Sequence, residues 1–403
     1  MAVGLKPASN LTPISGVRIG TAEAGVRYSG RPDLALFELA PGSTCAATFT
    51  QSAFAAAPVL LAKQHLEAAE CRSWLVNSGN ANAATGQPGL DDASATCTVV
   101  AEALGVSAQS VLPFSTGVIG ERMPLAAFER GVPAAVAALS EDGWLAGAEA
   151  IMTTDTVPKG ASRTVALSGG TVNITGIVKG SGMIRPDMAT MLAFAATDAV
   201  IAAELLRTML RTAVEYSFNR VTVDGDTSTN DACVLAATAA SGVVVTSDDD
   251  VAVLQAALND LALELAQGMI RDGEGASKFV SVVVEQGRDI EECLEVAYTI
   301  AHSPLVKTAL FASDPNWGRI VMAIGRAGVD ALDIDGVNVF LGDVSIVQAG
   351  GAAPSYTEAA GQAVMDQEDI TIRVQLGRGE ATETVWTSDL SHDYVTINAE
   401  YRT

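Results

Sequence analysis

The layout around one threonine is that expected for a chain that cuts itself. Thr190 lies between a Gly- and Pro-containing segment, 179–189, and an apolar, strand-like run, 191–196. Cleavage before Thr190 would expose its α-amino group, which can act as the base that activates the threonine hydroxyl. Such a nucleophile needs no histidine, and the sequence has three. The alternative is a β-branched residue that simply begins a strand.

The self-cleavage hypothesis has a definite chemical outcome. Thr190 Oγ can attack the carbonyl of Ala189 to form an ester, which water then opens. The products would be chains 1–189 and 190–403. This reaction also needs donors that hold the oxyanion formed during the attack.

Residues 112–122 offer one such pair of donors. Thr116 supplies a hydroxyl and Gly117 an amide, and glycine allows the backbone to approach a ligand closely. We interpret this segment as a turn-rich insertion between a hydrophobic run and a helix. An ordinary Ser/Thr/Gly turn is the alternative.

Two acidic segments suggest other chemistry. Asp224 and Asp226 follow a strand-like run, and paired carboxylates suit a hard cation, so a magnesium-dependent phosphoryl-transfer enzyme is a competing hypothesis. An Asx-turn network is the simpler interpretation. Further along, Glu274 stands between two glycines just before a predicted strand, where it could bind an ammonium group or lie in a solvated loop.

Composition excludes several classes of function. The formal net charge of −23 argues against a nucleic-acid or anionic-membrane surface. The five cysteines are scattered without CxxC spacing, which predicts neither a zinc site nor a disulfide framework and indicates a reducing compartment. No GxGxxG or GxxxxGK[ST] motif occurs, so no nucleotide cofactor is predicted. Since the N-terminus lacks signal-peptide features, we expect a cytoplasmic protein.

Periodicity predicts an α/β fold of layered sheets and helices. We place a main catalytic domain at 1–284 and a smaller C-terminal α/β domain at 285–403. The predicted helices are 91–104, 125–139, 144–152, 201–218, 251–270, 289–302 and 357–366. The predicted strands are 163–167, 171–178, 191–196, 279–284, 336–341 and 369–375, with a hairpin turn at 168–170.

Nine segments, in order along the chain, resemble one family: the arginine-biosynthesis glutamate N-acetyltransferases, also called ornithine acetyltransferases. Each segment alone is weak evidence, but the nine together are highly specific. They are 76–82 (VNSGNAN), 115–120 (STGVIG), 151–156 (IMTTDT), 179–184 (KGSGMI), 188–192 (MATML), 226–231 (DTSTND), 272–276 (DGEGA), 313–319 (SDPNWGR) and 398–403 (NAEYRT).

The resemblance implies a specific reaction. Members of this family cleave themselves before the threonine of the ATML motif, here Thr190, and that threonine takes the acetyl group of N2-acetyl-L-ornithine and passes it to L-glutamate. The oxyanion hole would fall on Thr116 and Gly117. The implied substrate-binding positions are Thr153, Thr154, Lys179, Thr190, Glu274, Asn398 and Thr403.

The resemblance also implies an assembly and a set of partners. The fold would be like that of certain self-processing aminopeptidases, with α and β chains in an α2β2 heterotetramer and with no metal or organic cofactor. A bifunctional member would accept acetyl-CoA as a second donor. Within the same scaffold, an aminopeptidase or amidohydrolase that passes the acyl group to water is the alternative.

Overall fold

The computed structural model describes residues 2–185 and 191–400. Ala189, Thr190 and Thr403 lie outside the described residues. Contacts divide the chain into two compact units, each with strands and helices, which confirms the predicted α/β class. Unit 1 comprises Met1–Leu5, Arg220–Gly225 and Ile270–Thr403, and unit 2 comprises Lys6–Asn219 and Asp226–Met269.

This division does not follow the domain boundary predicted between residues 284 and 285. That boundary would cut β11 (Phe279–Gly287), which pairs with β15 (Asp369–Gln375) and β16 (Ala381–Ser388). The short strand β9 (Val221–Thr222) also pairs with β16. Strand pairing between segments far apart in sequence therefore sets the units, and local composition does not reveal such pairing.

Unit 2 is built around two sheets. One has the order β1–β2–β4–β5 and the other the order β3–β10–β8–β7–β6. The first comprises β1 (Val17–Ala22), β2 (Leu34–Leu39), β4 (Ser73–Asn80) and β5 (Val111–Val118). The second comprises β3 (Thr44–Phe49), β6 (Lys159–Leu167), β7 (Gly170–Lys179), β8 (Leu192–Thr197) and β10 (Ala232–Ala237).

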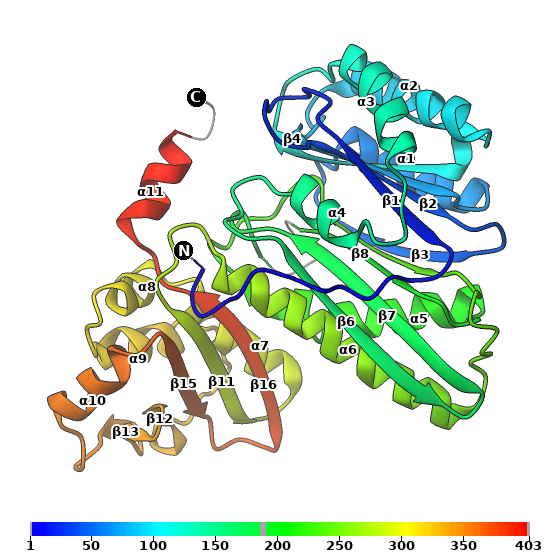
Figure 1. Ribbon diagram of the computed structural model, residues 1–403. Coiled ribbons are helices and arrows are strands. Elements are labelled where there is room, and N and C mark those ends of the chain that lie inside the picture. Colours follow the sequence, from blue (N-terminus) through cyan, green and yellow to red (C-terminus); the bar gives the residue numbers. More distant parts are fainter. Residues whose placement is uncertain (1, 186–190, 401–403) are drawn as a thin grey trace. The chain divides into compact units, whose positions relative to one another are not determined.

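Helices cover the outer faces of these two sheets, which gives unit 2 a layered α/β/β/α arrangement (Figure 1). Helices α1, α2 and α3 pack on the first sheet, α5 and α6 pack on the second, and the short α4 contacts strands of both. Their bounds are α1 (Ala57–Ala68), α2 (Gly86–Leu104), α3 (Leu125–Ala137), α4 (Trp144–Ala150), α5 (Ala203–Glu215) and α6 (Asp248–Arg271).

An aromatic cluster fills the space between the two sheets. Phe194 on β8 stacks on Phe37 of β2, with ring centroids 5.2 Å apart, and meets Phe114 of β5 edge-on at 5.2 Å. Trp74 of β4 lies 5.7 Å from the same ring. Because side chains alternate along a strand, one face of each strand points into this core. The cluster therefore fixes β8 against β5.

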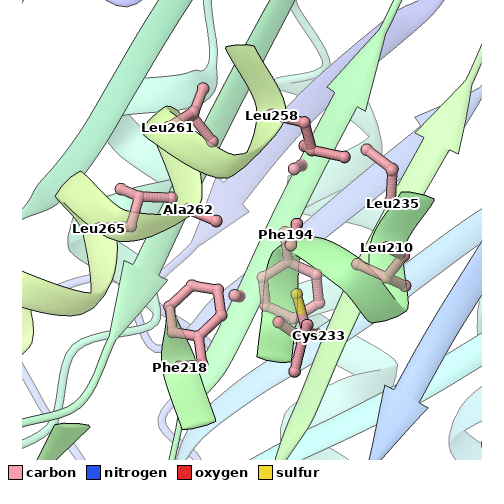
Figure 2. A pocket seen from close by; sticks show the side chains of 13 residues that line it. Phe194, Leu210, Phe218, Cys233, Leu235, Leu258, Leu261, Ala262 and Leu265 are labelled. Atoms are coloured by element: carbon pink, nitrogen blue, oxygen red, sulfur yellow. The ribbon is translucent and has the colours of Figure 1, made fainter. Parts of the chain in front are cut away.

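The other face of β8 carries small side chains. Ala193 and Ala195 line an apolar cavity of about 20 Å³. Leucines of α5 and α6, among them Leu210 and Leu261, line the same cavity (Figure 2). A Cβ added at Gly176 of β7 would lie 3.0 Å from Leu261 of α6. Small residues in β7 and β8 thus allow α6 to lie close to the sheet.

Unit 1 has a sheet of order β14–β13–β12–β15–β11–β16–β9. Helix α7 packs on β11 and β16, and α9 packs on α7. The elements not yet given are β12 (Asn338–Leu341), β13 (Val344–Gln348), β14 (Gly351–Ala352), α7 (Ile290–Ala301), α8 (Pro304–Phe311), α9 (Trp317–Gly325), α10 (Glu358–Met365) and α11 (His392–Ala399).

A buried lysine joins α8 to the end of β16. Lys307 Nζ donates to Thr387 Oγ1 at 2.9 Å and to the carbonyl of Ser388. Burial lowers the pKa of Lys307 to about 8, although the carboxylates of Asp389 and Asp224 act in the opposite direction. The folded protein therefore holds this ammonium group at a cost in desolvation.

Most predicted elements are confirmed, and their ends have local causes. Gly105 ends α2 with φ of 68°, a left-handed conformation that favours glycine. Asp289 caps α7 by accepting from the amide of Glu292 at 2.9 Å. The predicted hairpin is formed by β6 and β7. Within the described part of the chain, no helix combines the length and apolarity needed to cross a membrane.

Truncating the central aromatic ring tests the role of the core of unit 2. Phe194→Ala should lower the free energy of unfolding by about 3–5 kcal/mol, because it removes contacts to three rings and leaves a cavity. Phe54, which is 73% exposed, provides the control, since Phe54→Ala should change stability by less than about 0.5 kcal/mol. Urea unfolding measures both. Equal losses of stability in the two variants would contradict the central role of Phe194 in the core.

The pH dependence of stability tests Lys307. Its pKa in the folded protein, about 8, lies below its ordinary value of 10.5. Between these pH values the unfolded chain binds more protons, so stability should rise with pH. Relative to Lys307→Met, the wild-type protein should gain about 3 kcal/mol of unfolding free energy across this window. Parallel stability curves of the two proteins in urea titrations would refute the prediction.

Candidate active site

The structure describes most of the predicted site residues and distributes them between the two units. Unit 2 contains Thr116, Gly117, Thr153, Thr154 and Lys179, and unit 1 contains Glu274 and Asn398. The predicted nucleophile Thr190, its neighbour Ala189 and Thr403 lie outside the described residues.

Thr116 and Gly117 lie at the end of β5, beside Ser78 and Gly79 of the parallel strand β4. The prediction of a turn-rich insertion is wrong here, because the segment is an edge strand, a position that tolerates Pro113. Gly117 has φ of 136°, and an added Cβ would lie 2.2 Å from the carbonyl carbon of Gly79. Only glycine fits this close approach of two backbones.

Buried amides hold the end of β5 in place. Asn77 Oδ1 accepts from the hydroxyl of Ser115 at 2.7 Å. Asn230 Nδ2 donates to the carbonyls of Ala81, at 2.6 Å, and Ser115, at 2.9 Å. The Asn-rich segment 77–82 and the segment 226–231 thus meet next to the predicted oxyanion hole. Asn77 belongs to strand β4, which the sequence did not predict.

Lys179, at the end of β7, reaches the same place. Its ammonium group donates to Thr116 Oγ1 at 3.2 Å, and the residue is 5% exposed. A threonine hydroxyl that accepts such a bond keeps its own hydrogen available as a donor. Leu192, two residues beyond the predicted nucleophile, pairs with Lys179 in the β7–β8 ladder.

The turn that carries Thr153 and Thr154 is tied to the segment after β7. Thr154 Oγ1 and Ser181 Oγ are 2.7 Å apart. Asp155 accepts from Lys159 Nζ at 2.7 Å, and both side chains are almost fully buried. Burial raises the pKa of Asp155, but the ammonium groups of Lys159 and Lys179 outweigh it and hold the pKa well below its ordinary value.

Asp155 and Lys159 were not among the predicted site residues. The sequence places these two opposite charges four residues apart, but it does not show that both are buried. The one feature of the sequence that pointed to Asp155 was its place in segment 151–156, one of the nine segments that resemble the family. A buried ion pair near Lys179 distinguishes this turn from the exposed pairs of the same unit.

In unit 1 the structure brings together two of the predicted substrate-binding residues. Asn398 of α11 donates from Nδ2 to Glu274 Oε2 at 2.7 Å. The loop that carries Glu274 packs on the start of α11, because a Cβ at Gly275 would lie 2.5 Å from Ser391 Oγ. Asp389 fixes the same loop by accepting from the amides of Ser277, at 2.8 Å, and Lys278, at 3.0 Å.

Asp224, one of the two carboxylates on which the magnesium hypothesis depended together with Asp226, has a structural partner in unit 1. Its carboxylate accepts from the hydroxyl of Tyr394 at 3.1 Å. Across residues 2–185 and 191–400, no group of three or more His, Cys, Asp and Glu side chains has an arrangement that could hold a metal ion. The side chain of Asp224 thus contributes to the contact between the segment before Gly225 and α11.

The cluster in unit 2 is suited to stabilising a negative charge. The Thr116 hydroxyl and the Gly117 amide are donors, and the ammonium group of Lys179 adds positive charge beside them. Such donors stabilise an oxyanion strongly when they are held in place before the reaction. An ammonium group in a largely buried position also attracts a substrate carboxylate more strongly than one in water.

The chain is similar to proteins of one family over nearly its whole length. The sequence model of the ArgJ family matches residues 18–403. The arginine biosynthesis bifunctional protein ArgJ of Pseudomonas fluorescens is 54% identical over 406 residues, with 100% of both chains covered. The protein of the same name from Pseudomonas syringae pv. tomato is 52% identical, again with 100% of both covered.

A solved structure of ornithine acetyltransferase from Mycobacterium tuberculosis, complexed with ornithine, is 37% identical. The match covers 43% of the present chain and 93% of the M. tuberculosis chain, with a TM-score of 0.40.

Substitution of Gly117 tests the close approach of β4 and β5. Gly117→Ala should lower the free energy of unfolding by about 3 kcal/mol or more, because it combines backbone strain with overlap on Gly79. Gly105→Ala is the matched control, since Gly105 also has positive φ but has open space around it. That change should cost about 1 kcal/mol. If both variants unfold at the same urea concentration, the overlap is not significant.

Proposed function

Since this chain belongs to the ArgJ family, we propose that it transfers the acetyl group of N2-acetyl-L-ornithine to L-glutamate in arginine biosynthesis. It is an acyltransferase, and Thr190, exposed by cleavage after Ala189, is its nucleophile. Its relatives are named bifunctional, which supports acetyl-CoA as a second acetyl donor. The reaction takes place in the cytoplasm.

The contact between Lys179 and Thr116 is the structural observation that carries this proposal. It joins a positive charge to a hydroxyl donor, next to a glycine amide, at the end of an edge strand. Acyl transfer needs such donors, because negative charge develops on the carbonyl oxygen as the nucleophile attacks. The name of a relative, arginine biosynthesis bifunctional protein, independently supports a role in arginine biosynthesis.

The first half of the reaction forms an acetyl-enzyme. Thr190 Oγ attacks the acetyl carbonyl of N2-acetyl-L-ornithine, and its proton moves to the α-amino group of Thr190. The Thr116 hydroxyl and the Gly117 amide stabilise the tetrahedral oxyanion. The C–N bond then breaks, the leaving nitrogen takes the proton, and L-ornithine departs.

The second half transfers the acetyl group onward. The amino group of L-glutamate attacks the ester on Thr190 and gives a proton to the α-amino group of Thr190, while the same donors stabilise the second oxyanion. The ester C–O bond then breaks, Thr190 Oγ takes the proton back, and N-acetyl-L-glutamate leaves. Because both substrates use one site in turn, the kinetics are ping-pong. Lys179 binds the substrate carboxylate and Glu274 binds the side-chain ammonium group of ornithine. Thr153, Thr154, Asn398 and Thr403 complete the substrate contacts.

The strand order of unit 2 supports two chains that remain associated after cleavage. In the sheet β3–β10–β8–β7–β6, strands β3, β7 and β6 precede Thr190, whereas β10 and β8 follow it. The strands that follow Thr190 therefore pair on both sides with strands that precede it. Cleavage would leave these ladders intact, and two such α and β pairs form an α2β2 assembly.

Replacement of Thr190 tests the proposed function directly. Thr190→Ala should run as one full-length band on a denaturing gel and lose at least about 10⁴-fold of acetyl transfer, because the nucleophile is gone. Thr190→Ser keeps a hydroxyl and should still give two bands. Transfer is measured as N-acetylglutamate formed from N2-acetyl-L-ornithine.

Two results would overturn this proposal. One is a Thr190→Ala protein that is still cleaved after Ala189. The other is a wild-type enzyme that releases free acetate while glutamate remains unacetylated, since the acyl acceptor would then be water. Formation of N-acetylglutamate from acetyl-CoA, in the absence of acetylornithine, tests the second donor separately.

A further inference from the structure

Asp155 is a buried carboxylate that joins three segments of unit 2. Its Oδ1 accepts from Lys159 Nζ, at 2.7 Å, and from the amide of Gly180, at 2.8 Å. Its Oδ2 accepts from the amide of Thr153 at 3.0 Å. One side chain therefore bonds the turn after α4, the first residue of β6 and the segment that follows β7.

The residues next to these bonds are the ones that the proposed function assigns to substrate binding. Thr153 is itself a donor to Asp155, and Gly180 directly follows Lys179 in the chain. A second contact, between Thr154 and Ser181, joins the same two segments. A change at Asp155 would therefore alter the relative position of Thr153 and Lys179.

Burying a carboxylate with these contacts costs free energy, because the charged group loses its contact with water. The side chain of Asp155 is 0% exposed, and a buried ion pair often contributes less to stability than apolar residues of the same size would. Such a pair is best explained by a structural requirement that apolar residues cannot meet. Here that requirement is the simultaneous acceptance of two backbone N–H bonds from separate segments.

We infer that Asp155 is a positioning residue, which holds Thr153 and Lys179 at the separation that an amino-acid substrate requires. The inference rests on the proposed function for the roles of Thr153 and Lys179. Asp155 acts through these residues without touching the substrate. Its role is distinct from merely neutralising Lys159, and the two roles can be separated by mutation.

Three variants separate these roles. In Asp155→Asn the side-chain amide accepts only through its oxygen. That oxygen is expected at the Oδ1 position, which meets two donors, Lys159 Nζ and the Gly180 amide, so the amide nitrogen faces the N–H of Thr153 and that bond is replaced by two opposed donors. The double variant Asp155→Asn/Lys159→Met also removes the buried ammonium group. The matched control is Asp250→Asn, because Asp250 accepts from the amide and the hydroxyl of Ser168 at the opposite end of the β6–β7 hairpin.

Two readouts apply to each variant. Hydrogen exchange of the Thr153 amide reports whether the turn after α4 is still held, and the values of KM and kcat for both substrates report the effect on the reaction. For Asp155→Asn we expect Thr153 exchange and both KM values to rise about tenfold, with a smaller change in kcat. The double variant should remain impaired, whereas Asp250→Asn should keep wild-type KM values even if it melts at a lower temperature.

The contrary results are equally specific. Restoration of wild-type KM values in the double variant would show that Asp155 serves only to neutralise Lys159. Equal KM changes in Asp155→Asn and Asp250→Asn would show a general loss of stability. If Asp155→Asn does not cleave itself, unchanged Thr153 exchange overturns the inference and faster exchange supports it. A wild-type protein without acetyl transfer overturns the proposed function, and the exchange comparison then tests Asp155 alone.

Discussion

The packing of Phe194 against Phe114 is the contact on which the geometry of unit 2 depends. Phe194 lies on the strand that follows the predicted cleavage position, and Phe114 lies two residues before Thr116. Because both strands are pleated, fixing these two rings also fixes which residues emerge at the strand ends. The aromatic core therefore determines where the backbone of Gly117 lies relative to the start of β8. Polar contacts refine this position, but the apolar packing establishes it.

The polar residues around Thr116 show how buried hydrogen bonds can hold a site in one arrangement. Asn77, Ser115 and Asn230 satisfy one another and the backbone within the protein interior. Buried polar groups are costly unless they are hydrogen-bonded, so these residues specify one arrangement of β4 and β5. Unit 1 uses the same principle around Asp389, which accepts two backbone amides of the loop that carries Glu274.

Sequence patterns predicted helices α2 to α7 and α10, the β6–β7 hairpin and the α/β class, because caps and periodicity are local. They did not predict α1, α8, α9 and α11. They missed β5, where Pro113, Ser115 and Gly117 resemble a turn and where the pairing partner is decided by β4. They also missed the return of residues 220–225 to unit 1, since β9 pairs with a strand far along the chain. The candidate site residues came from motif resemblance. Asp155 could not be ranked in the same way, because its importance depends on burial.

The strand order of the second sheet determines when each strand can find its partner during synthesis. The ribosome completes residues 1–189 while β3 and β7 still lack their neighbours, β10 and β8, which lie between them in the sheet. The edge of β7 lacks its partner until residue 197 has been made, and the edge of β3 lacks its partner until residue 237 has been made. If the proposed cleavage before Thr190 takes place, a sheet that has closed first keeps both strand edges of the N-terminal chain paired.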